Sequence, residues 1–221
     1  MCGRFTSMMT WEELYYVLGG EISGDQSLLT DRYNVAPTQS IAAVIDVDGA
    51  YRLGPMHWGV QPEWASRPII NAQAEKYLRA DSSWWSSFRR CAIPGSGFYE
   101  WKRSEKSSQP MYVRVTDGRP FLFAGLYRVE SSDSDAPKGK AVIVTTAPNE
   151  LVEPIHNRMP AILRPEHVHA WLSPDTSRDE LVQALEPFPA EQMELWPVSS
   201  AVNRATAEGV ALIERVEGDD V

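Results

Sequence analysis

The chain has 221 residues, of which 43% are hydrophobic and 10% aromatic, so it is long enough to bury a core within one large domain or two small ones. Its formal net charge of −9 argues against a protein that binds nucleic acid through bulk positive charge, although affinity follows the local field. The two cysteines, Cys2 and Cys91, form neither a disulfide framework nor a metal motif, so we expect no metal and no cofactor. No apolar run approaches the roughly 20 residues that span a bilayer, and no signal peptide is evident, which predicts a soluble, cytoplasmic protein without a membrane partner.

The first predicted elements are a short helix and a β-hairpin. Thr10 is followed three residues later by Glu13, which is typical of a capping box at the start of a helix, and Gly19 is expected to end that helix. The Asp-Gly pair at 48–49 then predicts a hairpin turn between two strands, at residues 41–47 and 51–60.

The rest of the chain is expected to continue as strands with a few short helices. A second Asp-Gly pair, at 117–118, predicts a hairpin between residues 111–116 and 120–127. The β-branched run at 140–146 predicts a buried strand, and residues 209–216 are expected to form a last strand. Short helices are predicted at residues 72–80, 165–172 and 177–186.

Nothing in the sequence divides the chain into repeats or linked domains. We therefore expect one α+β domain over residues 1–221, built mostly of antiparallel sheet that curls towards a barrel or sandwich, with short peripheral helices. The polar residues 131–139 are expected to form an exposed loop, and the acidic end from about residue 214 a disordered tail.

Cys2 would become the N-terminal residue if Met1 were removed, and it would then carry both a free α-amine and a thiol. An α-amine has a pKa near 8, so roughly a tenth of it is neutral and nucleophilic at pH 7. A 1,2-aminothiol condenses with an aldehyde to an imine, and the thiolate then closes a five-membered thiazolidine ring. Two other interpretations stay open, an incidental residue in a frayed terminus and a nucleophile for acyl transfer.

Glu100 lies in "GFYEWK", where strand alternation places it on the same face as Phe98. A carboxyl group in such an apolar setting has its pKa raised by desolvation, which suits proton transfer near neutral pH. The spacing fits equally well a solvent-facing residue that pairs with Lys102 or Arg103.

Three further segments contain residues that suit a binding or catalytic site. His156, in the proline-bounded loop "PIHNRMP", is the best acid or base among the four histidines, and Arg158 fits either a phosphate contact or an ion pair. Asn71 follows an apolar run, so its side chain either caps a helix or hydrogen-bonds a substrate, whereas Glu75 is expected to be structural. Trp64, in "WGVQPEW", either stacks on an unpaired base or packs in the core.

Nine short motifs occur in order along the chain, from Cys2 to about Asn203. They are "MCGRF", "RYNVAPTQ", "WGVQPEWA", "INAQAE", "CAIPGSGFYEWK", "FAGLY", "VTTAPN", "IHNRMP" and "PVSSAVN". As an ordered set they closely resemble the SRAP family (SOS-response-associated peptidase), which is also described as the abasic-site-processing family.

The resemblance implies a monomeric enzyme that binds single-stranded DNA at an abasic site and joins it covalently, as a thiazolidine, in the DNA damage and SOS responses. It also implies a nucleoid-associated location and allows an associated lyase activity on abasic sites. By their positions in the motifs, Cys2 is the nucleophile, Asn71 positions the sugar or the α-amine, Glu100 acts as acid and base, and His156 assists proton transfer and sugar ring opening. The expected DNA contacts are Arg4, Trp64, Gln73, Trp101 and Arg158.

The sequence departs from the family pattern at two positions and leaves two other functions open. Gln73 stands where the family usually has an arginine, which lowers the expected affinity for DNA, and Ser96 stands where aspartate is more usual. One alternative is a cysteine-dependent peptidase or amidase, which would need an oxyanion hole that no segment indicates. The other is a non-enzymatic single-strand binder in which Cys2 is incidental.

Overall fold

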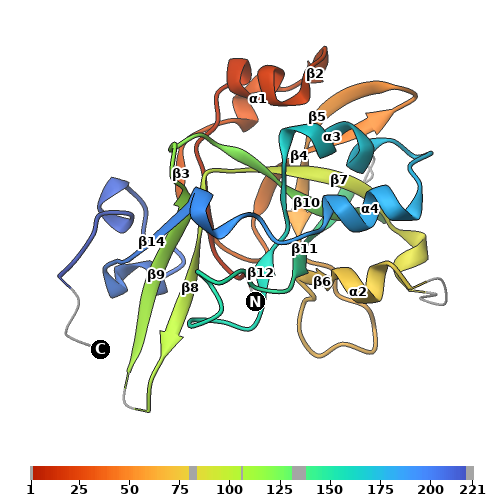
Figure 1. Cartoon of the computed structure of the whole chain (residues 1–221). Coiled ribbons are helices and arrows are strands. Elements are labelled where there is room, and N and C mark those ends of the chain that lie inside the picture. Colours follow the sequence, from red (N-terminus) through yellow and green to blue (C-terminus); the bar gives the residue numbers. More distant parts are fainter. Residues whose placement is uncertain (1, 80–83, 106, 131–137, 218–221) are drawn as a thin grey trace.

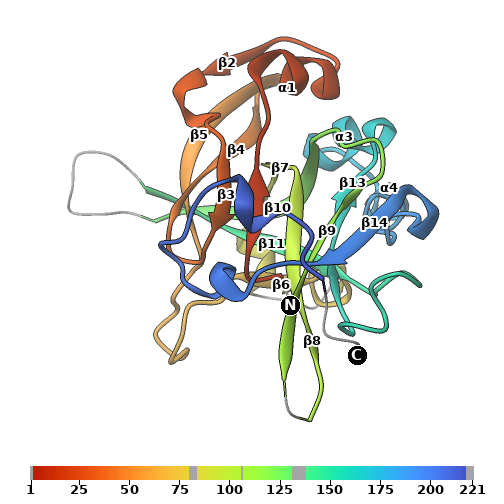
Figure 2. The same cartoon turned by 90° about the vertical axis from the view of Figure 1, so that its left-hand side faces the viewer.

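The chain folds as two β-sheets that pack against each other, with helices outside them (Figures 1 and 2). The computed structural model describes residues 2–79, 84–105, 107–130 and 138–217. The smaller sheet has five strands in the order β14 (Met193–Pro197), β9 (Ser108–Val115), β8 (Gly97–Arg103), β1 (Phe5–Ser7) and β3 (Arg32–Val35).

The larger sheet closes on itself, because β11 pairs with β5 as well as with β10. Its strand order is β12 (Met159–Pro160), β11 (Lys138–Thr146), β10 (Phe121–Glu130), β7 (Arg89–Gly95), β4 (Ser40–Val47), β5 (Ala50–Trp58) and β2 (Ile22–Gly24). Two short strands attach to this path, β13 (Ile162–Leu163) on β10 and β6 (Asn71–Gln73) on β11. The ring of mostly antiparallel strands confirms the predicted α+β class and the curling towards a barrel.

The helices are short, and local sequence signals explain where they begin. In α1 (Trp11–Leu18) the Thr10 hydroxyl accepts the Glu13 N–H at 3.2 Å, and the Glu13 carboxylate accepts the Thr10 N–H at 2.8 Å. Gly19 ends this helix at a φ of 62°, a conformation that favours glycine. The other helices are α2 (Ala74–Tyr77), α3 (Pro165–Leu172) and α4 (Arg178–Ala184), with 3₁₀ turns η1 (Gln26–Leu28), η2 (Trp85–Ser87), η3 (Ala190–Gln192), η4 (Ser200–Asn203) and η5 (Val210–Leu212).

The two Asp-Gly pairs form turns with different consequences. The pair at 48–49 joins β4 and β5 in a hairpin as predicted, with Val47 opposite Ala50. At 117–118 the Gly118 N–H donates to the Val115 carbonyl at 3.1 Å, but the predicted hairpin is wrong. β9 pairs with β8 and β14, whereas β10 pairs with β7, β11 and β13. The second turn therefore carries the chain from one sheet to the other.

Two other predicted elements differ from the structure. The predicted last strand at 209–216 is wrong: the segment forms η5 and a single bridge to Val198, because Leu212 turns into the core beside Trp196. The predicted helix at 72–80 is mostly wrong, because its first residues pair with β11 as β6 and leave only the four residues of α2. Residues 131–137 of the expected loop and 218–221 of the expected tail lie outside the described residues.

An aromatic cluster between the sheets anchors the beginning of the chain. The ring of Phe5 meets those of Trp58 and Phe123 edge-on, at centroid distances of 5.1 and 5.5 Å, and all three side chains are buried. Such aromatic pairs add about 0.5–1.5 kcal/mol each beyond the area they bury. Because Phe5 is only three residues after Cys2, this packing holds Cys2 against the sheets.

Candidate active site

Cys2 lies inside the protein and not in a frayed terminus. Its side chain is 0% exposed, and its Sγ is 3.8 Å from the Arg4 carbonyl oxygen. The segment runs antiparallel to β8, since the Tyr99 N–H donates to the Arg4 carbonyl at 3.0 Å and Phe5 lies opposite Phe98. Burial raises the pKa of the Cys2 thiol well above its ordinary value, and the nearby charge of Glu100 raises it further. The thiol is therefore protonated at neutral pH and needs a base to become a nucleophile.

Glu100 lies on β8 with its side chain turned into the protein. It is 3% exposed, and its neighbours Phe98 and Tyr99 are fully buried. The alternative of a solvent-facing carboxylate is wrong at this position. A buried carboxylate close enough to affect the pKa of the Cys2 thiol is a suitable proton acceptor for it.

Asn71 is the first residue of β6 and is 9% exposed. Its Nδ2 donates to the Ile143 carbonyl at 3.4 Å, while its Oδ1 is buried and accepts no hydrogen bond in the described part of the chain. The residue that caps α2 is Gln73, not Asn71. A buried amide oxygen without a donor costs free energy, which a bound N–H or O–H group would recover.

His156 is half-buried in the loop that precedes β12, and its backbone N–H donates to the Val152 carbonyl at 3.0 Å. The ring Nδ1 lies 3.0 Å from the Arg158 N–H and 3.1 Å from the Arg158 carbonyl oxygen. In the tautomer that carries its proton on Nε2, Nδ1 accepts the backbone N–H of Arg158. In the imidazolium, Nδ1–H donates to the carbonyl. The loop thus holds the ring in place in both protonation states.

Arg158 is held by protein groups. Its guanidinium donates to the two carboxylate oxygens of Glu75 at 2.8 and 3.0 Å and to the Thr145 carbonyl. Through these hydrogen bonds Arg158 lowers the pKa of the Glu75 carboxyl. Because Glu75 lies in α2 and Thr145 in β11, these contacts fasten the His156 loop to α2 and β11. Glu75 is thus structural, as expected, and Arg158 forms the ion pair that the sequence left as an alternative.

The four expected catalytic residues come from segments that pack around one hydrophobic cluster. Cys2 belongs to this cluster together with neighbours of the other three residues, namely Phe98 near Glu100, Ile70 beside Asn71, and Val152 and Met159 on either side of His156. Figures 1 and 2 show the segment that leads into β1 beside β6 and β8. The segments that hold Asn71, Glu100 and His156 thus pack around one cluster, although 29 residues separate Asn71 from Glu100 and 56 separate Glu100 from His156.

Arg4 and Trp101 are tied to the C-terminal part of the chain. The Arg4 guanidinium donates to Asn34 Oδ1 at 2.8 Å and to the carbonyls of Val202 and Asn203 at 2.6 and 3.2 Å. The Trp101 Nε1–H donates to Asn203 Oδ1 at 2.8 Å. Sequence reasoning gave no role to Asn34 and Asn203, although both lie in the ordered motifs. Their role as partners of Arg4 and Trp101 became visible only in three dimensions.

Trp64 and Gln73 are the remaining expected DNA contacts. Trp64 is 69% exposed, and its ring meets that of Trp84 edge-on at 5.6 Å. Gln73 is half-buried at the end of β6, opposite Thr145 of β11. Among the described residues, Trp64 is not part of the hydrophobic cluster that contains Cys2, whereas Gln73 is two residues from Asn71.

The described residues contain neither a metal-binding cluster nor a membrane-spanning helix. These residues contain no group of three or more histidine, cysteine, aspartate or glutamate side chains arranged to hold a metal ion. Within the same residues, no helix has the length and apolar character needed to cross a membrane.

Comparisons with known proteins agree with the motif pattern. The family described as SOS response associated peptidase (SRAP) matches residues 1–205. The chain is 38% identical to the abasic site processing protein YoqW of Bacillus subtilis, with 97% of this chain and 99% of that protein covered. It is 31% identical to the abasic site processing protein YedK of Escherichia coli, with 98% and 100% covered.

Solved structures show the same fold. A crystal structure of a protein from Bacteroides thetaiotaomicron superposes with a TM-score of 0.78 at 24% identity, covering 96% of this chain and 100% of that one. A phage-related protein from Bordetella bronchiseptica gives a TM-score of 0.70 at 28% identity, covering 89% and 94%.

Proposed function

Because the chain belongs to the SRAP family, we propose that it captures abasic sites in single-stranded DNA through Cys2 as a covalent DNA–protein crosslink. The relatives YoqW and YedK are named abasic site processing proteins and match nearly the full length of the chain. The observation that carries the proposal is the position of Cys2, a buried thiol at the second residue, beside the buried carboxylate of Glu100. Removal of Met1 would add an α-amine to that thiol.

The chemistry requires an amine, a thiol and an aldehyde. The α-amine of Cys2 adds to the aldehyde carbon of the ring-opened sugar, and loss of water gives an imine. The Cys2 sulfur then attacks the imine carbon while its proton moves to the imine nitrogen, which closes the thiazolidine. The products are the ring and one water molecule, and no oxidant or reductant is needed.

Each neighbouring side chain has a separate role in this scheme. In imine formation Glu100 passes a proton from the nitrogen to the departing water. In ring closure it takes the thiol proton and passes it to the imine nitrogen, because the raised pKa of the Cys2 thiol leaves little thiolate without a base. Asn71 Oδ1, which is buried without a donor among the described residues, accepts an N–H of the amine or a sugar hydroxyl. As the imidazolium, with Nδ1–H donating to the Arg158 carbonyl, His156 releases its Nε2 proton to the ring oxygen of the closed sugar as it opens and becomes neutral. The imine is also the intermediate from which strand cleavage by a lyase reaction would proceed.

A bound DNA strand would contact the side chains that the motifs indicate. The exposed ring of Trp64 suits stacking on an unpaired base, which contributes about 1–3 kcal/mol. The guanidiniums of Arg4 and Arg158 already bind protein groups, so a phosphate would use their remaining N–H groups or compete with Asn34 and Glu75. Gln73 and Trp101 would lie along the same strand. We propose a monomer that acts at the nucleoid in the DNA damage and SOS responses.

Hydrolysis of peptides by Cys2 is the competing function, and the structure offers less support for it. A catalytic cysteine usually has a lowered thiol pKa, whereas burial and Glu100 raise that of Cys2. Acyl transfer by Cys2 would therefore need the same proton transfer to Glu100 as ring closure and, in addition, an oxyanion hole, although limited self-removal of Met1 would be compatible with the site.

Mass spectrometry of the intact protein, after mixing with a single-stranded abasic oligonucleotide, tests the proposal. We expect a protein without Met1 and an adduct whose mass is the sum of protein and oligonucleotide less one water. Cys2→Ala should abolish the heat-stable adduct and leave at most an imine that borohydride traps. Equal labelling of an oligonucleotide with intact bases, or an adduct that persists unchanged in Cys2→Ala, would refute the proposal.

A further inference from the structure

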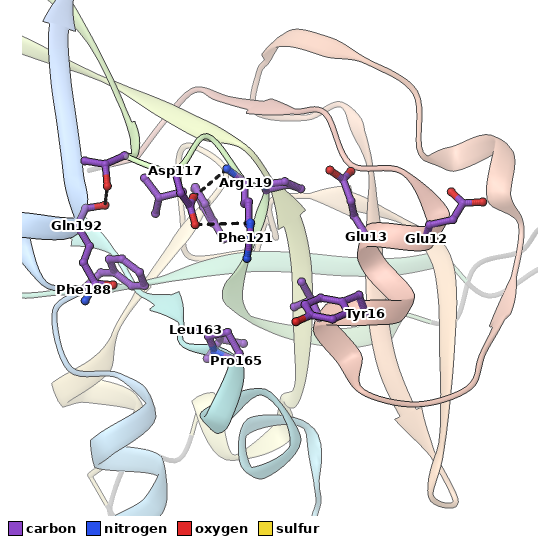
Figure 3. A pocket seen from close by; sticks show the side chains of 14 residues that line it. Glu12, Glu13, Tyr16, Asp117, Arg119, Phe121, Leu163, Pro165, Phe188 and Gln192 are labelled. Carbon is purple, nitrogen blue, oxygen red and sulfur yellow. Dashed lines mark hydrogen bonds and ion pairs between the residues drawn. The ribbon is translucent and has the colours of Figure 1, made fainter.

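Another candidate site lies beside α1, away from the segments that hold the expected catalytic residues. A cavity of about 590 Å³ is lined by α1, by the turn between β9 and β10, by β13 and by the segment around Phe188 and Gln192 (Figure 3). The candidate active site instead uses β6, β8 and the loop before β12, and both overall views show α1 well above that region (Figures 1 and 2). The volume lies within the range of about 300–1,000 Å³ that is typical of ligand sites.

The floor of this cavity is apolar. Phe121 and Leu163 are almost fully buried, with exposures of 6% and 2%, and Phe188 and Val115 complete the surface. Figure 3 shows Leu163 and Phe188 on one side and Tyr16 on the other. A surface of this kind accepts an aliphatic or aromatic side chain and gains free energy in proportion to the apolar area that leaves water.

The wall formed by α1 carries uncompensated negative charge. The Glu13 carboxylate accepts only from the neutral N–H and hydroxyl of Thr10, and Glu12 forms no ion pair within the described residues. On the opposite wall, the Asp117 charge is offset by Arg119 at 3.8 Å. Two negative charges therefore remain at one side of an apolar floor.

Tyr16 completes the charged wall. It is 79% exposed and follows Glu12 by one helical turn, so its ring and that carboxylate share one face of α1. The opposite face of the helix is held in the core by Leu14 and Leu18. An aromatic ring beside carboxylates attracts a lysine or arginine through both the ring face and the charges.

We propose that this cavity binds a segment of a partner protein in which a lysine or arginine stands next to an apolar residue. The apolar side chain would enter the floor at Phe121 and Leu163, and the cation would lie between Tyr16 and Glu12. The acidic wall repels phosphate, so the occupant is not the DNA strand. Because the cavity and the Cys2 site use separate segments, such a partner can remain bound while the protein holds DNA.

Binding of short labelled peptides to the full chain tests this site. The probes are three pentapeptides, Gly-Lys-Phe-Lys-Gly, Gly-Glu-Phe-Glu-Gly and Gly-Lys-Gly-Lys-Gly. Their binding to the protein is measured by fluorescence anisotropy at low salt. We expect the first to bind at least 10-fold more tightly than the other two. Tyr16→Ala should weaken the binding of Gly-Lys-Phe-Lys-Gly about 10-fold. Tyr15→Ala, on the same helix but outside the cavity lining, should leave that binding unchanged.

Two further comparisons separate charge from location. Glu12→Gln should weaken binding several-fold and reduce its salt dependence, whereas Glu21→Gln, an exposed carboxylate outside the cavity lining, should do neither. Equal binding of the basic and acidic peptides, or equal effects of Tyr15→Ala and Tyr16→Ala, would overturn the proposal. Displacement of the peptide by single-stranded DNA would overturn it too, because the peptide would then occupy the DNA site. None of these results depends on whether Cys2 crosslinks DNA.

Discussion

Replacement of Glu100 by glutamine distinguishes two roles of its carboxylate that predict opposite changes in rate. The charge of Glu100 raises the pKa of the Cys2 thiol. If the carboxylate acted only through its charge, its removal would produce more thiolate and faster ring closure. If it accepts and donates protons in the reaction, its removal would slow crosslinking. Glutamine is close in size to glutamate, so the buried position on β8 should remain filled.

The two effects differ in magnitude as well as in sign. Nearby charges shift a pKa over separations of about 4–6 Å, and at the far end of that range, with an effective dielectric constant of about 20, two unit charges interact by about 2.8 kcal/mol, or about two pKa units. The charge effect alone would therefore accelerate thiol addition by up to about 100-fold. A positioned general acid or base contributes about 10²–10⁴-fold. Because the Cys2 thiol is buried and its pKa is raised, we expect the proton-transfer role to dominate and the rate to fall by at least 10-fold.

Single-turnover crosslinking, followed on denaturing gels at saturating protein, measures this rate. Non-covalent affinity is measured separately with an oligonucleotide whose abasic analogue carries no aldehyde, and it should be nearly unchanged. Glu105→Gln is the matched control, since Glu105 is an exposed glutamate just beyond the end of β8. Faster crosslinking in Glu100→Gln would refute the proton-transfer role. A loss of affinity in proportion to the loss of rate would instead assign Glu100 a structural role.

Four further outcomes are expected. In Cys2→Ala, gel analysis should show no heat-stable adduct, and an unchanged yield would contradict the role of the thiol. His156→Ala should slow both adduct formation and transfer of the trapped strand to fresh protein, because a group that assists ring opening also assists its reverse; a slowing in one direction alone would contradict this. Gln73→Arg should tighten binding to single-stranded DNA and change the slope of log K against log[salt] by about −0.7, and an unchanged slope would place Gln73 away from the DNA backbone. Arg158 lowers the pKa of the half-exposed Glu75 carboxyl, so their ion pair stabilises the fold above the ordinary pKa of about 4.3, and this stabilisation is lost as pH falls through the lower folded-state pKa. Glu75→Gln should therefore lower the free energy of unfolding in denaturant by about 1 kcal/mol or less at pH 7 and leave it unchanged in strong acid. An equal loss at both pH values would exclude the ion pair as its cause.

Elements and site residues that depend on neighbours in sequence could be predicted from the sequence. The capping box of Thr10 and Glu13 and the hairpin turn at 48–49 formed as expected, because each requires only hydrogen bonds or backbone conformations within a few residues. The orientation of Glu100 could be narrowed to two choices by strand alternation, but the choice between core and solvent needed the second sheet. The family, and with it the interest in Cys2, followed from the order of nine motifs.

The rest was decided by contacts between distant segments. The turn at 117–118 has hairpin chemistry, yet its strands joined different sheets, since β9 pairs with β8 and β14 whereas β10 pairs with β7, β11 and β13. The burial of Cys2 depends on Phe5 packing against Trp58 and Phe123, which no local pattern specifies. Likewise, Arg158 carries the same charge in any context, and only the approach of α2 to the His156 loop placed Glu75 on its guanidinium. Sequence thus determined the local turns and the reactive groups, whereas tertiary packing determined which of those groups meet, because burial and ion pairing depend on segments brought together by the fold.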